Sequence, residues 1–382
     1  MSAPLVRGWC PGALRPMRAE DGLVVRVRPR LTRLSAAQAQ GLAALAERYG
    51  AGVIEVTSRA SLQLRGVSEG DHAALVSELQ SLGLADTDAA REARCAVLVA
   101  PCRDAEAEAL AAALDAGLAA AVDLELPSKF GFVVDCGATR QLADVSGDIR
   151  LERSLEGLIL RADGSPTGLP VAPDDAVEAA LELARWFVMS GGVGADGRGR
   201  MAAHLVRVAL PEALSGHALP VEKVAPMHPG RTSEGMTVAA GFGLFPATSV
   251  AKLAEQTDAL IPTPWRSFFL PGAPELALDP DLITDPRDPL LRLHGCTGAP
   301  ACPQAEAETR SIARQLARDL PDGVTLHVSG CAKGCAHPGP ADLTLTGRDG
   351  RFDLIRAGRA SDPPERRGLA PDQLHRMFQN AP

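Results

Sequence analysis

The sequence has few aromatic residues: phenylalanine, tryptophan and tyrosine together make up 3% of its 382 residues. Hydrophobic residues still reach 46%, so the core has to be built mainly from alanine, leucine and valine. An excess of positive charge is also missing, because the net charge is −8, and this argues against a general nucleic-acid binder. At roughly 150 residues per domain, the length indicates two or three domains.

Targeting and membrane signals are missing as well. Residues 1–18 contain no apolar core of the signal-peptide type. The longest uncharged stretch, residues 235–251, is interrupted by glycine, threonine and proline, and is too short for a membrane span. We therefore expect a soluble, cytoplasmic protein. Because the cytoplasm is reducing, the eight cysteines are not expected to form disulfides.

Four of these cysteines form two close pairs late in the chain. Five residues separate Cys296 from Cys302, and three separate Cys331 from Cys335. A four-iron cluster needs four thiolates that converge on one small object, and two close pairs on two loops can supply them. Structural zinc pairs usually have two to four intervening residues, so the longer spacing is unusual for zinc. The pattern predicts a [4Fe-4S] cluster, with a zinc site as the alternative.

The residues around the two pairs suit a cluster. Pro303 follows Cys302 and favours the first turn of a helix, so we expect a helix over residues 304–320 whose N-terminal end points at the cluster. Glycines flank the pairs where the backbone has to approach the inorganic core: Gly295, Gly298, Gly330 and Gly334. The remaining cysteines are scattered and are interpreted as small buried hydrophobic residues: Cys10, Cys95, Cys102 and Cys136.

Two parts of the sequence repeat each other. Each begins with a predicted strand, at Asp21 and at Glu234, and continues with a helix and a second strand. We expect that second strand to run over residues 53–66 in the first copy and over residues 263–272 in the second. Four residues match at one constant offset, Thr57, Ser61, Leu64 and Gly66 aligning with Thr263, Ser267, Leu270 and Gly272. The shared order of elements indicates a duplication.

Each copy is followed by a stretch in which strands alternate with helices, which is typical of α/β units. The first stretch lacks close cysteine pairs, and the second contains both of them. We therefore predict four parts: a first half-repeat (1–80), an α/β domain without a cluster (81–225), a second half-repeat (226–275) and an α/β domain with the cluster (276–382).

The cysteine segments, residues 296–302 and 329–335, resemble the cluster motifs of the sulfite and nitrite reductase hemoprotein family. Residues 126–130 resemble that family's substrate-side motif, and residues 57–59 resemble its ferredoxin-like half-repeats. The resemblance implies a mixed α+β and α/β fold, in which two ferredoxin-like half-repeats form one domain. Two α/β domains would complete it around a central tetrapyrrole site, and Cys335 would lie closest to the bound tetrapyrrole.

Residues 7–12, 21–28 and 331–338 are similar to the branch of that family that oxidises precorrin-3A in aerobic cobalamin biosynthesis. This similarity implies a monooxygenase that hydroxylates precorrin-3A at C20 and closes a γ-lactone, using O₂ and two electrons. The sequence differs from the sulfite reductases at one position in a way that favours this branch. Gly131 stands where those enzymes have their second active-site lysine, and the loss of that charge weakens the electrostatic clamp for a small anion. The alternatives are a siroheme-dependent assimilatory sulfite or nitrite reductase and a non-enzymatic iron–sulfur electron carrier.

A precorrin carries several carboxylates, and burying them requires fixed cations, best supplied by arginine. Arg26 and Arg28 alternate on one predicted strand and so share a face, as do Arg59 and Arg65 on the next. Arg94 precedes a third strand, where the family often has an active-site arginine. We predict that these five arginines bind the substrate.

Two lysines are predicted to be catalytic. Lys129 stands in the substrate-side motif, and Lys333 lies between two cluster cysteines, where it could supply a proton or hold a carboxylate. A mononuclear non-heme iron would also suit oxygen chemistry. Three histidines flank the cysteine segments, but a hydrogen-bonded role in loops and strands is the favoured interpretation for each: His294, His327 and His337.

No flavin or nicotinamide motif is recognisable in the sequence. The glycine-rich run at residues 191–197 follows a predicted helix rather than a strand, so it lacks the context of a dinucleotide site and is interpreted as a loop. Electrons are therefore expected from a separate ferredoxin or NAD(P)H-dependent reductase.

Overall fold

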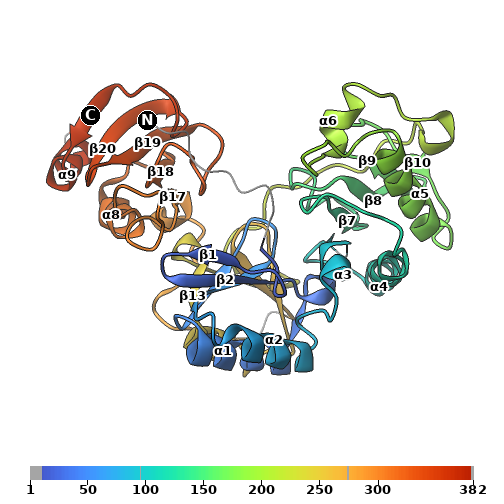
Figure 1. Ribbon diagram of the computed structural model, residues 1–382, viewed down its shortest axis with the longest axis horizontal. Helices are drawn as coiled ribbons and strands as arrows, with labels where there is room; N and C mark the ends of the chain where they lie inside the picture. Colours follow the sequence, from blue (N-terminus) through green and yellow to red (C-terminus); the bar gives the residue numbers. More distant parts are fainter. Residues whose placement is uncertain (1–10, 95, 273–274, 380–382) are drawn as a thin grey trace.

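The computed structural model describes residues 11–94, 96–272 and 275–379. Figure 1 shows three parts: a lower body that contains segments from both half-repeats, and one α/β domain above it on either side. Cys10 and Cys95 lie outside the described residues. Within the described ranges, no helix combines the length and the apolar character that crossing a bilayer requires.

The lower body contains two sheets with matching strand orders. The first sheet consists, in order, of β1 (Met17–Ala19), β2 (Gly22–Val27), β5 (Leu62–Val67), β4 (Val53–Val56) and β13 (Leu244–Pro246). The second consists of β11 (Gly230–Arg231), β12 (Gly235–Ala240), β15 (Ser267–Pro271), β14 (Ala259–Pro262) and β3 (Leu34–Ser35), with β16 (Leu282–Ile283) also paired to β12. This agreement supports the duplication that the sequence indicates.

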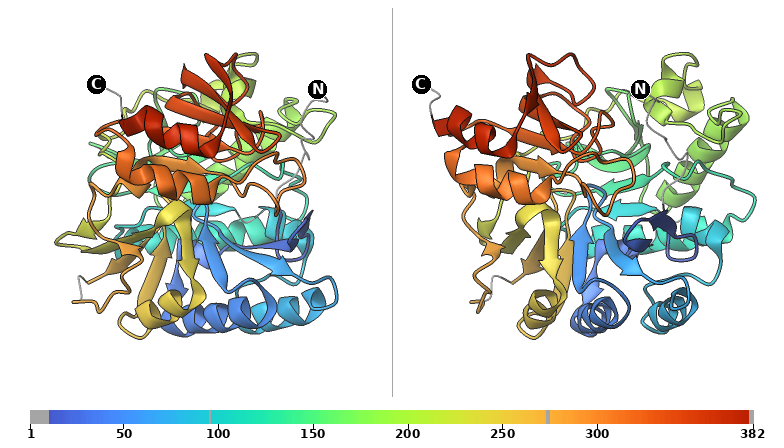
Figure 2. Two further views of the ribbon diagram at one scale, coloured as in Figure 1. Left: turned by 90° about the vertical axis from the view of Figure 1, so that its left-hand side faces the viewer. Right: turned by 60° about the vertical axis from the view of Figure 1, so that its left-hand side comes forward.

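Each half-repeat contributes one short strand to the sheet of the other. Strand β13 pairs with β4, with Phe245 opposite Ile54, and β3 pairs with β14, with Leu34 opposite Leu260. Helices from both copies cover one side of the two sheets (Figure 2): α1 (Ala36–Tyr49), α2 (His72–Ser81) and α7 (Ala247–Ala254). The buried apolar residues of the two copies consequently form a single core.

Local sequence explains where α1 begins. Ser35 Oγ accepts a hydrogen bond from the Gln38 backbone at 3.2 Å, and Gln38 Oε1 accepts one from the Ser35 backbone at 3.0 Å. This capping box satisfies two backbone donors at the helix start. Buried residues then recur at helical spacing, among them Ala39, Leu42 and Ala46, and direct one face of α1 into the core.

The prediction of one continuous strand over residues 53–66 is wrong. Strands β4 and β5 are antiparallel and are joined by a tight turn, in which Thr57 N donates to Ser61 O at 2.9 Å. Ala60 takes a φ of 51° in this turn, which reverses the chain. Arg59 therefore lies in a turn and does not share a strand face with Arg65.

The second half-repeat has the same turn between β14 and β15. Thr263 N donates to Ser267 O at 2.8 Å, and Arg266 has a φ of 59°. The residues that matched at one offset in the sequence thus define a structural motif, and each copy presents it towards the α/β domains.

The two α/β domains also share one topology. Each sheet has three parallel strands followed by two antiparallel strands. The first contains β6 (Val97–Val99), β7 (Phe132–Asp135), β8 (Ile149–Ser154), β9 (Gly157–Ala162) and β10 (Leu169–Pro170). The second contains β17 (Leu293–Gly295), β18 (Leu326–Ser329), β19 (Ala341–Arg348), β20 (Arg351–Gly358) and β21 (Arg366–Leu369). The loops after β6 and β7 are therefore equivalent to the loops after β17 and β18.

The remaining helices belong mostly to these two domains: α3 (Ala89–Arg94), α4 (Ala105–Ala120), α5 (Ala176–Met189), α6 (Met201–Leu205), α8 (Arg310–Leu316) and α9 (Pro371–Gln379). Short 3₁₀ turns complete the fold: η1 (Arg30–Thr32), η2 (Glu212–Leu214), η3 (Gly241–Gly243), η4 (Pro289–Arg292) and η5 (Ala317–Asp319).

Candidate functional site

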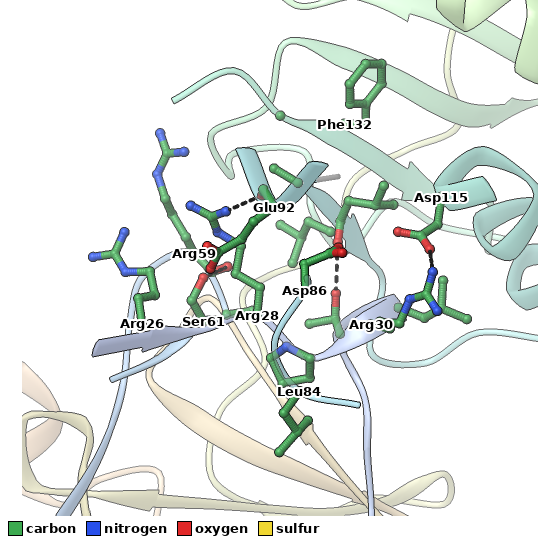
Figure 3. A pocket seen from close by; sticks show the side chains of 18 of the residues that line it. Arg26, Arg28, Arg30, Arg59, Ser61, Leu84, Asp86, Glu92, Asp115 and Phe132 are labelled. Carbon is green, nitrogen blue, oxygen red and sulfur yellow. Dashed lines mark hydrogen bonds and ion pairs between the residues drawn. The ribbon is translucent and has the colours of Figure 1, made fainter. Parts of the chain in front are cut away.

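A cavity of about 270 Å³ lies between the first half-repeat and the first α/β domain. Its wall is formed by the end of β2, the turn η1, the turn after β4 and part of α3 (Figure 3). Ser128 and Gly131, from the loop before β7, also line it. Arginines outnumber acidic residues in the wall, with Arg26, Arg28, Arg30, Arg59 and Arg91 against Asp86, Glu92 and Asp115.

Arg26 and Arg28, which the sequence predicts to bind the substrate, both line the cavity. Arg26 donates to Gln63 Oε1 through Nη2 at 2.6 Å and through Nε at 3.2 Å. Arg28 Nη1 donates to the carbonyl of Glu92 at 2.7 Å. These uncharged acceptors hold both guanidinium groups in fixed orientations.

Arg59 connects the half-repeat body to the α/β domain. Its Nη1 donates to the carbonyl of Lys129 at 3.1 Å, and its Nη2 lies 3.4 Å from Ser146 Oγ. The Lys129 side chain is exposed, whereas its neighbours Ser128 and Gly131 line the cavity. Arg59 therefore lines the cavity, and it contacts the backbone carbonyl of Lys129 rather than the Lys129 side chain.

Two of the arginines predicted to bind substrate lie away from the cavity wall. Arg65 makes two hydrogen bonds of 3.0 Å to the carboxylate of Asp21. Arg94 is only 7% exposed, and its Nε donates to the Leu118 carbonyl at 3.4 Å. Its helix neighbour Arg91, which the sequence analysis did not single out, lines the cavity instead.

A buried carboxylate fixes the loop that carries Gly131. Asp148 is fully buried and accepts hydrogen bonds from Arg200 Nε at 2.8 Å, from Gly131 N at 3.0 Å and from Met201 N at 2.9 Å. Burial raises the pKa of Asp148, and the Arg200 guanidinium opposes that rise. Arg200 also donates to Ser146 Oγ at 2.8 Å, the hydroxyl that Arg59 approaches. No sequence pattern indicates this network, because it depends on tertiary contacts.

Replacing Asp148 with alanine should lower the free energy of unfolding by about 3 kcal/mol, because Arg200 and two backbone donors lose their shared acceptor. Urea denaturation of the purified variant measures this. Asp144→Ala is the matched control, since Asp144 makes an exposed ion pair with Lys223 and should cost under about 1 kcal/mol. Equal losses for the two variants would contradict the assigned role.

The cysteine segments follow adjacent parallel strands. Cys296 comes directly after β17, and Cys331 lies two residues after β18. The carboxyl ends of parallel strands meet at one edge of a sheet, so the two loops are neighbours. Gly330 N donates to Cys296 Sγ at 3.2 Å, which ties one cysteine loop to the other.

The four thiols share one electrostatic environment. Burial raises the pKa of Cys331, and the thiols of Cys296 and Cys302 raise it further. The pKa of Cys335 is raised, first by its removal from water and then by the other three thiols, while Lys333 lowers it. A cationic iron centre would relieve this mutual repulsion between thiolates.

Among the described residues, no group of three or more histidine, cysteine or acidic side chains is placed to hold a metal ion. This result applies equally to a zinc site and to a cluster, so it does not distinguish between them. The cluster remains a prediction, supported by the common edge and the shared electrostatics of the four thiols.

The prediction of a helix over residues 304–320 is only partly right. The backbone after Cys302 makes bonds to other loops: Glu306 N donates to Gly330 O at 2.8 Å, and Ala307 O accepts from Ala299 N at 3.0 Å. Helix α8 consequently begins only at Arg310. Its start is still tied to the cysteines, because Thr309 Oγ1 donates to the carbonyl of Cys296 at 2.6 Å.

Two of the predicted glycines allow the cysteine loops to approach each other. A Cβ atom at Gly330 would lie 2.6 Å from Ala305 Cβ, and one at Gly298 would lie 2.6 Å from Thr309 Oγ1. Gly298 also has a φ of 72°, which side chains disfavour. The requirement for glycine here comes from packing between the loops.

Gly330→Ala should therefore force the loops apart, costing about 1–3 kcal/mol of stability and reducing the iron bound after reconstitution. Thermal denaturation and iron analysis would measure both effects. Gly70→Ala serves as the control, since a Cβ atom there meets only Ser68 Oγ, at 3.8 Å. Normal iron content and normal stability in Gly330→Ala would show that the two cysteine loops can move apart to accommodate a side chain, and that glycine is not required there.

Three histidines gather beside the cysteine loops. The rings of His294 and His337 stack at 4.3 Å, and His327 lies 5.9 Å from His337. The expected hydrogen bond exists for His337, whose Nε2 lies 3.0 Å from the Pro340 carbonyl. His327 is fully buried, and neither of its ring nitrogens has a hydrogen-bond partner among the described residues. Burial lowers the pKa of His294 to about 3 and that of His327 to about 4, so both are neutral.

Arg266 links the second half-repeat to the cysteine loops. Its Nη2 donates to the carbonyl of Ala336, the residue after Cys335, at 3.1 Å. Arg266 lies in the turn equivalent to the one that carries Arg59. Each half-repeat thus uses the same turn to hold a loop of a different α/β domain, although the repeat aligns Arg266 with Ala60 and not with Arg59.

Comparisons with known proteins agree with this architecture. Residues 15–82 match the family model described as the nitrite/sulfite reductase ferredoxin-like half domain. A curated Sinorhizobium sp. protein named precorrin-3B synthase is 31% identical, the match covering 95% of this chain and 85% of the relative. The structure of the Mycobacterium tuberculosis NirA protein is similar with a TM-score of 0.63 and 17% identity, covering 94% of this chain and 79% of that one. The predicted sulfite reductase-like fold with ferredoxin-like half-repeats is confirmed.

Proposed function

Because the chain belongs to the precorrin-3B synthase family, we propose that it catalyses the oxygen-dependent hydroxylation of precorrin-3A at C20, with closure of a γ-lactone. One atom of O₂ enters the product, and the other is reduced to water by two electrons and two protons. The observation that carries the proposal is the arginine-lined cavity between the first half-repeat and the first α/β domain.

The cavity chemistry suits a polycarboxylate. Arg26, Arg28 and Arg59 come from two different strand ends and present guanidinium groups to one space (Figure 3). Guanidinium groups bind carboxylates through paired hydrogen bonds, and several of them can orient one macrocycle by its acidic side chains. In this proposal the three arginines hold the substrate, and Asp148 and Arg200 keep the loop with Gly131 in position.

The proposal includes a [4Fe-4S] cluster held by Cys296, Cys302, Cys331 and Cys335. When bound, such a cluster supplies one-electron transfer, with electrons drawn from a separate ferredoxin or NAD(P)H-dependent reductase. Lys333 lies between two of these cysteines, and we assign it to holding or delivering a proton at that edge. Lys129 is assigned to the substrate side, next to the loop residues that line the cavity.

Gly131 favours this reaction over the reduction of a small anion. A Cβ atom at Gly131 would meet the Ala96 carbonyl at 3.5 Å, an ordinary contact, so the backbone leaves space for a side chain. Lack of space therefore does not explain why position 131 has no lysine. Its absence weakens the electrostatic clamp that sulfite or nitrite would need.

The decisive experiment is anaerobic purification with iron and sulfide analysis, followed by precorrin-3A turnover under ¹⁸O₂ and mass spectrometry of the product. About four irons per chain and one ¹⁸O in the product are expected. A bound siroheme with reduction of sulfite or nitrite by reduced methyl viologen would replace the proposal with the reductase. A cluster without either activity would indicate an electron carrier.

A further inference from the structure

Residues 11–15, at the start of the described chain, form a turn that packs against α3. Gly12 and Ala13 are buried, and Ala13 belongs to the core that the two half-repeats share. Gly12 N donates to the carbonyl of Arg15 at 3.0 Å, which closes the turn. Gly12 is also part of residues 7–12, the segment that is similar to the precorrin-3A branch of the family. Residues 11–15 are called the N-terminal turn below.

Two contacts fix the N-terminal turn to the first half-repeat. Arg26 N, on β2, donates to the Gly12 carbonyl at 3.2 Å. His72 Nε2, at the start of α2, lies 2.9 Å from the Ala13 carbonyl. Because both partners belong to regular elements of the half-repeat body, the turn is a fixed point against which other residues can be positioned.

The carboxylate of Glu92, on α3, bonds to this turn. Its Oε1 accepts from Ala13 N at 2.6 Å, and its Oε2 accepts from Leu14 N at 3.2 Å. The fit is close, since a Cβ atom at Gly12 would lie 2.6 Å from Oε2. Helix α3 has only six residues, and so short a helix depends on tertiary contacts for its stability. The Glu92 carboxylate therefore helps to fix the position of α3.

The backbone of Glu92 bonds in turn to an arginine of the cavity. Arg28 Nη1 donates to the Glu92 carbonyl at 2.7 Å (Figure 3). One residue thus connects the N-terminal turn, through its side chain, with Arg28, through its carbonyl. Arg91, the residue before Glu92, also lines the cavity and pairs with Asp86 at 3.3 Å. A shift of α3 would consequently disturb two guanidinium groups in the cavity wall.

We propose that Glu92 is a positioning residue for substrate binding, which orients the Arg28 guanidinium group by fixing α3 to the N-terminal turn. A guanidinium group that is already held in one orientation loses less conformational entropy when it binds a carboxylate, and so binds it more tightly. Glu92 lines the cavity, but its role is to act through Arg28. This inference rests on the proposed function, because it takes precorrin-3A as the ligand of the arginine-lined cavity.

Glu92→Gln is expected to weaken precorrin-3A binding by roughly 5- to 20-fold, because the amide keeps the shape of the side chain but turns an N–H group towards one of the two backbone donors. Equilibrium titration of the anaerobic protein measures the dissociation constants. In an Arg28→Ala background, the same substitution should change the affinity by less than about twofold, because the group on which Glu92 acts is gone. A residue that only stabilises the fold would not show this dependence on Arg28.

Gly12→Ala tests the same contact from the opposite side, since its Cβ atom would displace the Glu92 carboxylate, and it should show a comparable loss of affinity. Glu69→Gln is the matched control, because Glu69 makes an exposed ion pair with Arg18, and its affinity should be unchanged. Unchanged affinity in Glu92→Gln and Gly12→Ala, or equal losses from Glu92→Gln in the two backgrounds, would overturn the inference alone. Absence of precorrin-3A binding by the unmodified protein would overturn the proposed function, and this inference with it.

Discussion

Cys331→Ser is expected to lose the proposed iron–sulfur cluster and, with it, nearly all of the proposed turnover of precorrin-3A. A serine hydroxyl stays protonated at neutral pH and is a poor iron ligand, so three thiolates would remain for a cluster that needs four. Iron and sulfide per chain and the visible spectrum of anaerobically reconstituted protein measure the effect.

The fold supplies a matched control for this variant. Cys136 follows β7 in the first α/β domain, where Cys331 follows the equivalent strand β18 in the second. Cys136→Ser should therefore keep the full iron content, although it changes the same residue type at a related position. Full iron content and normal turnover in Cys331→Ser would show that the ligand assignment is wrong.

Arg59→Ala is expected to weaken precorrin-3A binding by roughly 10- to 100-fold, the effect of losing a charge-assisted hydrogen-bond partner. Arg59 lies on the cavity wall and also contacts the Lys129 carbonyl and Ser146. Arg59→Lys keeps the positive charge without the planar fork and should show an intermediate loss. Equilibrium titration of the anaerobic protein with precorrin-3A measures the dissociation constants.

Arg65→Ala is the appropriate control for Arg59, because Arg65 belongs to the neighbouring strand but pairs with Asp21 outside the cavity wall. Its precorrin affinity should match that of the unmodified protein. The iron content of Arg59→Ala should also be unchanged, since Arg59 contacts the other α/β domain. Loss of iron in Arg59→Ala would mean that this residue is structural.

Features that depend on local sequence could be predicted well. The capping pair Ser35 and Gln38 determines the start of α1, and the cysteine spacing identified two loops that the fold brings to one edge. The turn at residues 57–61 was missed because its alternating pattern imitates a strand, whereas the chain reverses there with a positive φ at Ala60.

Features that depend on tertiary contacts could not be predicted from spacing. Arg91 and Arg94 lie on one short helix, yet only Arg91 lines the cavity, since the packing of α3 against its neighbours decides which side chain is buried. The bond between Asp148 and Arg200 joins residues far apart in the chain. The helix expected after Cys302 begins late because its first residues bond to the second cysteine loop.

The exchange of β3 and β13 between the half-repeats has a consequence for biosynthesis. During translation, β4 emerges early, but its partner β13 follows only after the whole first α/β domain has been made. Until then β4 is an open sheet edge, which is prone to pair with other chains. Such non-local pairing also slows folding, because a long loop must close first. We therefore expect the nascent chain to be prone to aggregation until the second half-repeat has been made, and each half-repeat expressed alone to be less stable than the whole chain.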